Sequence, residues 1–233
     1  VLIVPGGKVT MHMAILMFGE PGAEILYPDP GFPIYRSMIE FTGAKPVPVP
    51  IREENGFAFS ADETLALITP KTRLLIINSP ANPTGGVTPK AEIDKMVKRL
   101  AKFPDVAIMS DEIYAQMTYD GLAHQTLLAY PEIRDRLILL DGWSKTYAMT
   151  GFRIGWVAGP KDIIQAINTF LSQSAGNCCS VSQAAAVAAL NGDQSFVKDS
   201  VETYQKRRDR TVSRINAIKG LSCITPKGAF YLY

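Results

Sequence analysis

Short apolar runs alternate with longer stretches of helical periodicity along the first two thirds of the chain. The apolar runs are bounded by glycine, proline or polar residues, a pattern typical of buried strands. They predict strands at Leu2–Val4, Glu24–Tyr27, Lys45–Val49, Leu74–Asn78, Val106–Ser110, Leu137–Asp141 and Arg153–Ala158.

Helices are predicted between these strands. Their ranges are Val9–Phe18, Ile34–Phe41, Lys90–Phe103 and Tyr114–Tyr130, the last one broken at Asp120-Gly121. Thr88-Pro89 precedes the third range and predicts an N-cap followed by a proline at the first helical position. Strands that alternate with helices predict an α/β fold with a mostly parallel central sheet and helices on its faces.

Past residue 160 the pattern becomes helical, with predicted helices at Lys161–Leu171, Val181–Leu190 and Gln194–Lys219. The final residues, Gly228–Tyr233, predict one more strand. We expect residues 1–195 to form a large domain, and residues 196–233 to form a connecting helix and the beginning of a truncated small domain. Because the chain opens and closes in apolar strands, the sequence predicts a piece of a longer protein.

Composition and charge narrow the classes of function. The chain of 233 residues is 47% hydrophobic and 20% charged, which is typical of a globular protein. Its net charge of +2 does not favour nucleic acid or an anionic membrane as a partner. No apolar run approaches the ~20 residues of a membrane-spanning helix. We expect neither nucleic acid nor membrane as a partner.

The cysteines and histidines predict neither a disulfide nor a metal site. Cys178 and Cys179 are adjacent, and Cys223 makes the number odd, which favours reduced thiols in a cytoplasmic protein. His12 and His124 are far apart and show no ligand spacing with the cysteines.

Polar side chains follow several of the predicted strands. The loop of Gly6, Gly7 and Lys8 follows the first strand and opens a helix, so its N–H groups suit a phosphate. Asn82 follows the fourth strand, Asp111 with Glu112 ends the fifth, and Lys145 follows the sixth. Since ligands bind at the carboxyl ends of parallel strands, we expect these groups to meet at one edge of the sheet.

Lys145 and Arg153 together indicate a kind of ligand. A lysine amine whose pKa is lowered by burial or by a nearby cation can attack an aldehyde. An arginine eight residues later suits a phosphate. The pair fits a cofactor that carries both an aldehyde and a phosphate.

Each of these signals also has a purely structural interpretation. Gly6-Gly7 and the segment around Asn82 are ordinary turn sequences, and Asp111 could cap a helix at Ile113. Arg153 could be a solvated strand residue. The order and spacing of the whole set favour a site over these separate explanations.

The chain resembles the large domain of the pyridoxal-phosphate-dependent aminotransferases of fold type I, class I/II, the aspartate aminotransferase-like group. The motifs that carry the resemblance are Pro5-Gly6-Gly7-Lys8, Pro28-Asp29-Pro30-Gly31-Phe32-Pro33-Ile34-Tyr35, Asn78-Ser79-Pro80-Ala81-Asn82-Pro83-Thr84-Gly85, Ser110-Asp111-Glu112-Ile113-Tyr114, Ser144-Lys145, Gly151-Phe152-Arg153-Ile154-Gly155 and Pro226-Lys227-Gly228-Ala229-Phe230-Tyr231.

The resemblance implies catalytic roles for two residues. Lys145 would hold pyridoxal 5′-phosphate as an internal aldimine, and its freed amine would then move a proton between the substrate α-carbon and the cofactor. Asp111 would pair with the pyridine nitrogen and keep it protonated, so that the ring can accept electrons. The implied reaction is the transfer of an amino group between an amino acid and a 2-oxo acid.

The other implied contacts position the cofactor. Asn82 and Tyr114 would donate to the phenolic oxygen of the ring, and Phe32 would stack on its face. Tyr35 is expected in the core or at an interface. The phosphate would be bound by Arg153 with the backbone of Gly6, Gly7 and Lys8, while the Lys8 side chain lies at the surface.

The sequence departs from the family pattern at Gly142, where many members carry a serine or threonine. We expect slightly weaker phosphate binding unless Ser144 or a water compensates. Family members extend beyond this chain at both ends, and the residue that binds the substrate carboxylate is expected in the missing C-terminal part. The resemblance also implies a homodimer with the cofactor near its interface.

Three alternatives to an aminotransferase remain open. A carbon–sulfur lyase of the same fold would use the same lysine. A transcription regulator that uses the fold to bind an effector would need a basic helix-turn-helix arm, which these residues do not contain. The chain could also bind the cofactor without turnover.

Overall fold

The computed structural model describes residues 1–233 and contains one seven-stranded sheet in the order β1-β7-β6-β5-β4-β2-β3. β7 runs antiparallel to both of its neighbours, whereas the other neighbouring pairs are parallel. The carboxyl ends of six strands and the amino end of β7 therefore meet at one edge. The strands are β1 Leu2–Val4, β2 Glu24–Asp29, β3 Lys45–Pro50, β4 Thr72–Asn78, β5 Ala107–Asp111, β6 Leu137–Gly142 and β7 Gly155–Ala158.

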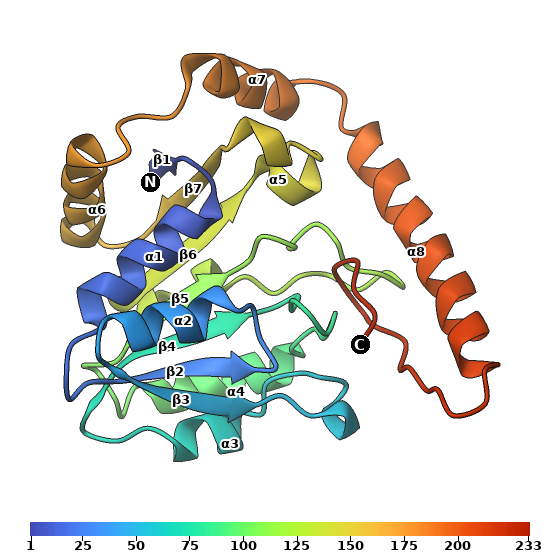
Figure 1. Ribbon diagram of the computed structural model, residues 1–233, viewed down its shortest axis with the longest axis horizontal. Coiled ribbons are helices and arrows are strands. Elements are labelled where there is room, and N and C mark those ends of the chain that lie inside the picture. Colours follow the sequence, from blue (N-terminus) through green and yellow to red (C-terminus); the bar gives the residue numbers. More distant parts are fainter.

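Helices cover both faces of this sheet, and a long helix lies beside it (Figure 1). They are α1 Gly7–Phe18, α2 Ile34–Phe41, α3 Ala61–Ala66, α4 Lys90–Leu100, α5 Trp143–Thr146, α6 Lys161–Gln173, α7 Ser180–Asn191 and α8 Ser195–Asn216. Short 3-10 helices lie at Glu53–Asn55, Leu127–Ala129, Pro131–Arg136 and Thr150–Phe152. The predicted α/β fold with a mostly parallel sheet is confirmed.

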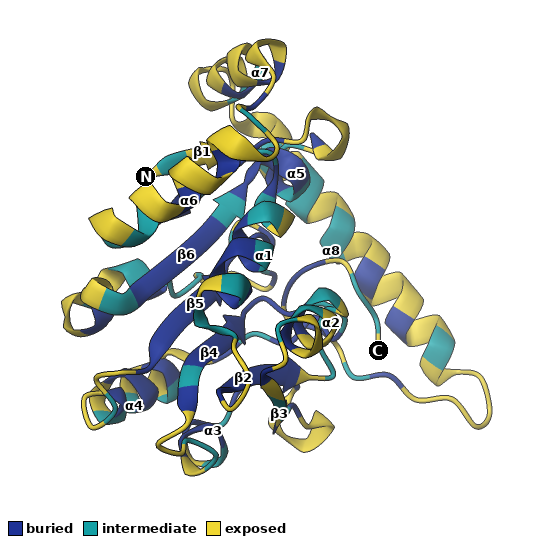
Figure 2. Ribbon diagram, turned by 60° about the vertical axis from the view of Figure 1, so that its left-hand side comes forward, coloured by how far each residue is buried: buried dark blue, intermediate teal, exposed yellow.

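The strands divide their side chains between two cores. In β4, Leu74 and Ile76 pack with α1, α2 and α6, whereas Leu75 and Ile77 pack with α3 and α4. This period of two places apolar residues on both faces, so central strands are continuous apolar runs. Figure 2 shows these strands buried, while α6, α7 and α8 are largely exposed.

The seven strands predicted between residues 2 and 158 all form, with boundaries that differ by at most two residues. β7 begins at Gly155 rather than at Arg153. Residues 150–152 form a 3-10 helix and Arg153 adopts a left-handed conformation, with φ 50° and ψ 55°. Arg153 is therefore not a strand residue but part of the turn that enters β7.

The predicted helix at Tyr114–Tyr130 is wrong. Asp120 and Gly121 both have positive φ angles, which end any helix there. The backbone of this segment pairs instead with residues more than a hundred positions later, because Tyr119 N donates to Lys227 O and Ala229 N donates to Met117 O. Tertiary hydrogen bonds thus replace the helical ones.

Three smaller predictions also differ from the structure. α4 starts at Lys90 with Pro89 at its N-cap, while the Thr88 hydroxyl accepts from Phe59 N, so Thr88 is not the cap. The predicted C-terminal strand is also wrong, because only an isolated bridge joins Gly228 to Thr118. The sequence prediction missed α3, although the Ser60 side chain caps it by accepting from Glu63 N, as the Ser-x-x-Glu pattern indicates.

The last helix, α8, contacts the rest of the molecule at few points. Its buried residues are Arg208 and Val212. Arg208 forms two hydrogen bonds of 2.8 Å with the Asp120 carboxylate and donates to Pro226 O. It therefore joins α8 both to the segment that follows β5 and to the C-terminal segment that pairs with it. No helix of the structure has both the length and the apolar character required to span a membrane.

Candidate cofactor site

A cavity of about 470 Å³ lies at the edge of the sheet where the carboxyl ends of β1, β4, β5 and β6 meet. Eight of the nine predicted site residues, which lie next to the ends of six different strands, line this one cavity. They are Gly7, Lys8, Phe32, Asn82, Asp111, Tyr114, Lys145 and Arg153. Gly6, the remaining predicted residue, lies directly behind the Arg153 side chain.

Gly6 and Arg153 approach each other closely. Gly6 has φ 85° and ψ 159°, a conformation open almost only to glycine. A Cβ atom at Gly6 would lie 2.2 Å from Arg153 Nη2, so the guanidinium occupies the space that a side chain would need. Arg153 Nη1 donates to Thr150 O at 2.8 Å, which holds the guanidinium beside the N-terminus of α1. A cation and free N–H groups at a helix N-terminus together form an anion-binding corner.

Asp111 is a buried carboxyl group at the end of β5. Its Oδ2 accepts from the Tyr35 hydroxyl at 2.6 Å, and its Oδ1 accepts from Ile113 N at 3.2 Å. Burial raises the pKa of Asp111 to about 6, despite these two hydrogen bonds. The Ile113 contact has the form of the helix cap that we considered, but no helix follows it. Tyr35 is fully buried, as predicted, and additionally orients this carboxyl group.

The neighbouring carboxylate, Glu112, is used in a different way. Its Oε1 accepts from Ser110 Oγ and from Leu127 N, and its Oε2 lies 2.7 Å from His124 Nε2. Glu112 thus stabilises the segment that follows β5. Of the two adjacent acids, only Asp111 lines the cavity.

Lys145 lies on α5, directly after β6. Its Nζ is 5.8 Å from the centre of the Tyr114 ring and 5.4 Å from that of Phe230. Burial lowers the pKa of Lys145, and the nearby positive charge of Arg153 lowers it further, while Asp111 opposes this. An amine with a lowered pKa is neutral in a larger fraction of molecules, which makes it a better nucleophile.

Asn82 and Tyr114 form a hydrogen-bonded group with a residue that the sequence prediction missed. Asn82 Nδ2 donates to the Tyr231 hydroxyl at 3.1 Å, and the hydroxyl groups of Tyr231 and Tyr114 are hydrogen-bonded to each other. Tyr231 also lines the cavity. The amide and both phenols are thus polar groups at one end of the cavity.

The structure explains the glycine at position 142. β6 and β7 pair at Gly142 and Gly155, and a Cβ atom at Gly142 would lie 2.7 Å from Gly155 Cα. No side chain fits there without moving β7. Hydroxyl groups come instead from Ser144 and Thr150, which both line the cavity.

Lys8 and Phe32 form the outer wall. Lys8 Nζ lies 5.5 Å from the centre of the Phe32 ring, which favours contact between the cation and the ring face. Lys8 is exposed, as predicted for its side chain, and borders the cavity as well.

Five lining residues were not predicted as site residues: Met11, Ile113, Ser144, Thr150 and Tyr231. Ser144 and Ile113 are neighbours of predicted residues in the same motifs, so proximity in sequence would have found them. Tyr231 had only the motif Pro226–Tyr231 as a signal, and that motif indicates no direction for its side chain.

Comparison with known proteins places the whole chain in one family. The family model for aminotransferase class I and II matches residues 1–233. The chain is 40% identical over 234 residues to an aspartate/prephenate aminotransferase from Cereibacter sphaeroides, with 100% of this chain and 58% of that protein covered. An aspartate aminotransferase from Rhizobium meliloti is 37% identical, with 100% and 57% covered. The chain therefore spans a little more than half the length of these relatives.

Solved structures agree with the sequence comparison. The crystal structure of the aspartate aminotransferase from Rhizobium meliloti has a TM-score of 0.94 at 37% identity, covering 99% of this chain and 58% of that one. An aromatic aminotransferase from Pyrococcus horikoshii has a TM-score of 0.93 at 36% identity, with 99% and 62% covered.

Proposed function

The chain belongs to the class I and II aminotransferase family, and on that premise we propose that it transfers an amino group between an amino acid and a 2-oxo acid with pyridoxal 5′-phosphate. The observation that supports this most is the meeting of Lys145, Asp111 and Arg153 in one cavity, from three separate strand ends. Aspartate and prephenate, which name relatives of this chain, are the first substrates to test.

The residues that line the cavity fit pyridoxal 5′-phosphate in their chemistry. Arg153 and the N-terminus of α1 suit a phosphate, and Gly6 leaves room for the guanidinium that a Cβ atom would displace. Asp111 is a buried carboxyl group with no cation hydrogen-bonded to it, so a protonated pyridine nitrogen would complete its interactions. At the other end, Asn82 and Tyr114 offer donors for an anionic oxygen.

When bound, pyridoxal 5′-phosphate supplies an aldehyde that reacts with amines and a pyridinium ring that accepts electrons. In our proposal Lys145 Nζ is the group that attaches to this aldehyde. With the cofactor and a substrate bound, Nζ would take a proton from the substrate α-carbon and would later return one. The lowered pKa of Lys145 favours its neutral form, which the first of these proton transfers requires.

Asp111 acts on the pyridine nitrogen in this proposal. Its carboxylate keeps a proton on the pyridine nitrogen, and the Tyr35 hydroxyl orients it from behind. Because Tyr35 and Ile113 N both donate to Asp111, the carboxylate has its direction fixed before any ligand arrives.

Borohydride reduction tests the proposed function. After pyridoxal 5′-phosphate is added to the chain, we expect a new visible absorbance, and reduction should fix the cofactor to Lys145, as read by peptide mass spectrometry. Lys161→Ala, a change at an exposed residue outside the cavity, should leave the label in place. An unchanged spectrum, or a label on another lysine, would contradict the assignment.

We propose that two copies of the chain associate. α7 buries only Ser182 and Ala186, while Val187 and Leu190 on it are 57% and 54% exposed, and Phe170 on α6 is 48% exposed. Such an apolar surface is typical of a contact between subunits. Sedimentation equilibrium should give the mass of a dimer, and Val187→Asp should shift the equilibrium toward the monomer. A monomeric parent chain would contradict this.

Two further expectations remain proposals. We assign residues 1–195 to a cofactor-binding domain and residues 196–233 to a connection toward a smaller one, because α8 leaves the layers around the sheet (Figure 1). Limited proteolysis should cut first near this boundary. We also place the protein in the cytoplasm, since Cys178, Cys179 and Cys223 are unpaired. Cell fractionation tests the location.

A further inference from the structure

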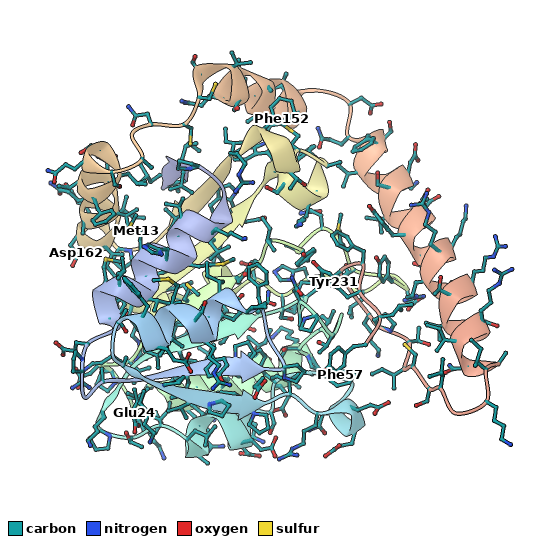
Figure 3. All side chains as sticks on the ribbon, viewed as in Figure 1. Met13, Glu24, Phe57, Phe152, Asp162 and Tyr231 are labelled. Atoms are coloured by element: carbon teal, nitrogen blue, oxygen red, sulfur yellow. The ribbon has the colours of Figure 1, made fainter.

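Tyr231 is a cavity residue to which the proposed function assigns no role. It lies between the carboxyl edge of the sheet and α8 (Figure 3). Its hydroxyl accepts from Asn82 Nδ2 at 3.1 Å and is hydrogen-bonded to the Tyr114 hydroxyl. The rings of Tyr114 and Tyr231 meet edge to face, with their centres 5.6 Å apart.

The amide fixes the direction of one contact in this group, whereas either hydroxyl can donate in the contact between Tyr114 and Tyr231. An amide nitrogen can only donate, so the Tyr231 oxygen is the acceptor of the contact with Asn82. Tyr231 has one hydroxyl proton, and its other hydrogen-bond partner is the Tyr114 oxygen. With that proton directed to Tyr114, the Tyr114 oxygen is the acceptor, and its own proton is free to point into the cavity.

Burial keeps both protons in place. It raises the pKa of Tyr114 well above the usual range, and it also raises the pKa of Tyr231. Both phenols therefore remain protonated around neutral pH. Each can serve as a donor and an acceptor at the same time.

We propose that Tyr231 is a positioning residue that directs the Tyr114 proton into the cofactor cavity and makes Tyr114 the stronger donor. The inference rests on the proposed function, because the acceptor of that proton is the phenolic oxygen of pyridoxal 5′-phosphate. A hydroxyl that accepts one hydrogen bond donates the next more strongly. Tyr231 thus acts on the cofactor through Tyr114.

The backbone around Tyr231 is held firmly enough for this role. Gly228 N donates to Gly85 O at 3.0 Å, in the loop that follows β4. Ala229 N donates to Met117 O at 2.8 Å, in the segment that follows β5. A Cβ atom at Gly228 would lie 2.6 Å from Pro80 Cβ, so only glycine allows this approach. The segment that carries Tyr231 is thereby tied to the loops that carry Asn82 and Tyr114.

Two single variants and their combination test the inference in the cofactor-loaded chain. With the cofactor held by Lys145, a donor to the phenolic oxygen would most strongly stabilise the form in which Lys145 Nζ has lost its proton. Tyr231→Phe removes the hydroxyl but keeps the ring, so the pH midpoint of the cofactor absorbance should rise by roughly 0.5–1 pH unit. Tyr114→Phe should raise this midpoint further. In a chain that already carries Tyr114→Phe, adding Tyr231→Phe should not change the midpoint.

Tyr204→Phe is the matched control. Tyr204 packs on Phe230, 5.6 Å between ring centres, and no hydrogen bond joins its hydroxyl to Asn82, Tyr114 or Tyr231. Its midpoint should equal that of the parent chain. The inference would be overturned if Tyr231→Phe left the midpoint unchanged, or if it shifted the midpoint equally in the parent chain and in the Tyr114→Phe chain. Neither outcome would contradict the proposed function.

A second measurement needs no cofactor. In a chain labelled with ¹³C at the tyrosine Cζ atoms, the Tyr114 signal is assigned by its loss in Tyr114→Phe. We expect Tyr231→Phe to move this signal and Tyr204→Phe to leave it in place. A stationary Tyr114 signal would refute the inference, whether or not the chain binds pyridoxal 5′-phosphate. Failure to bind pyridoxal 5′-phosphate would refute the proposed function instead.

Discussion

Replacing Lys145 with alanine is expected to slow amino-group transfer by about 10⁴-fold or more, because proton transfer by a positioned group alone contributes ~10²–10⁴-fold and the covalent attachment is lost as well. Lys145 is placed for both tasks by its position after β6, at the edge where the cavity opens. Arg153 and Lys8 also line the cavity, but neither can replace it. A guanidinium does not lose its proton, and Lys8 is exposed and lies against Phe32 at the outer wall.

Single-turnover release of a 2-oxo acid, with aspartate as the first donor, measures this effect. A small primary amine such as methylamine should restore part of the rate in Lys145→Ala, because the missing side chain leaves space for it. Rescue would separate the loss of the amine from a loss of the fold. Turnover within about tenfold of the parent chain would show that another group moves the proton, since that is less than general acid–base catalysis contributes.

The sequence predicted the site residues that lie at strand ends, because each of them follows from a local pattern. Buried parallel strands appear as short apolar runs, and the polar residue that ends a run lies at the edge of the sheet. Asp111 after β5 and Lys145 after β6 are found in this way. The strand pattern alone does not separate Asp111 from Glu112, and only the family resemblance favoured Asp111. The structure shows why Glu112 is not available, because Ser110, Leu127 and His124 bind it.

The parts that were mispredicted depend on contacts between distant residues. Residues 114–130 have helical periodicity, but their backbone pairs with the C-terminal segment, which no local pattern indicates. The same pairing brings Tyr231 to Tyr114, 117 positions apart in the chain. Tyr35 was predicted as buried, which is correct, yet its hydrogen bond to Asp111 requires α2 to pack beside β5.

Replacing Asp111 with asparagine is expected to have two effects of opposite sign. Amino-group transfer should slow by ~10²–10³-fold, the loss typical when one preorganised electrostatic contact to a reacting group is removed. Asparagine keeps the shape of the side chain but carries no charge, so it cannot hold a proton on the pyridine nitrogen. The cofactor-free chain, in contrast, should become more stable above pH 6.

The gain in stability follows from the pKa of Asp111. Burial raises this pKa from 3.8 to about 6 in the folded chain, so the folded state binds the proton more tightly than the unfolded state. Well above pH 6 both states are ionised, and folding bears a cost of about 3 kcal/mol for the buried charge. The cost declines as the pH falls through 6 and is absent below about 4, where both states are protonated.

Asparagine removes this cost but weakens one contact. Its single carbonyl oxygen can replace only one of the two acceptors that Tyr35 and Ile113 N now use, a loss of about 1 kcal/mol. The net gain should therefore be about 1–2 kcal/mol at pH 8 and should disappear or reverse near pH 4. Urea unfolding of Asp111→Asn and the parent chain at both pH values measures the difference.

Asp162→Asn provides the control for the loss of one negative charge. Asp162 is exposed in the first turn of α6, at the left edge of the view in Figure 3 and away from Tyr231. It should neither stabilise the chain at pH 8 nor slow the transfer. If Asp111→Asn destabilised the chain at both pH values, the carboxylate would be part of the framework and not a group held ready for a cation. Slower transfer together with greater stability indicates a charge that folding alone does not favour and that the bound cofactor requires.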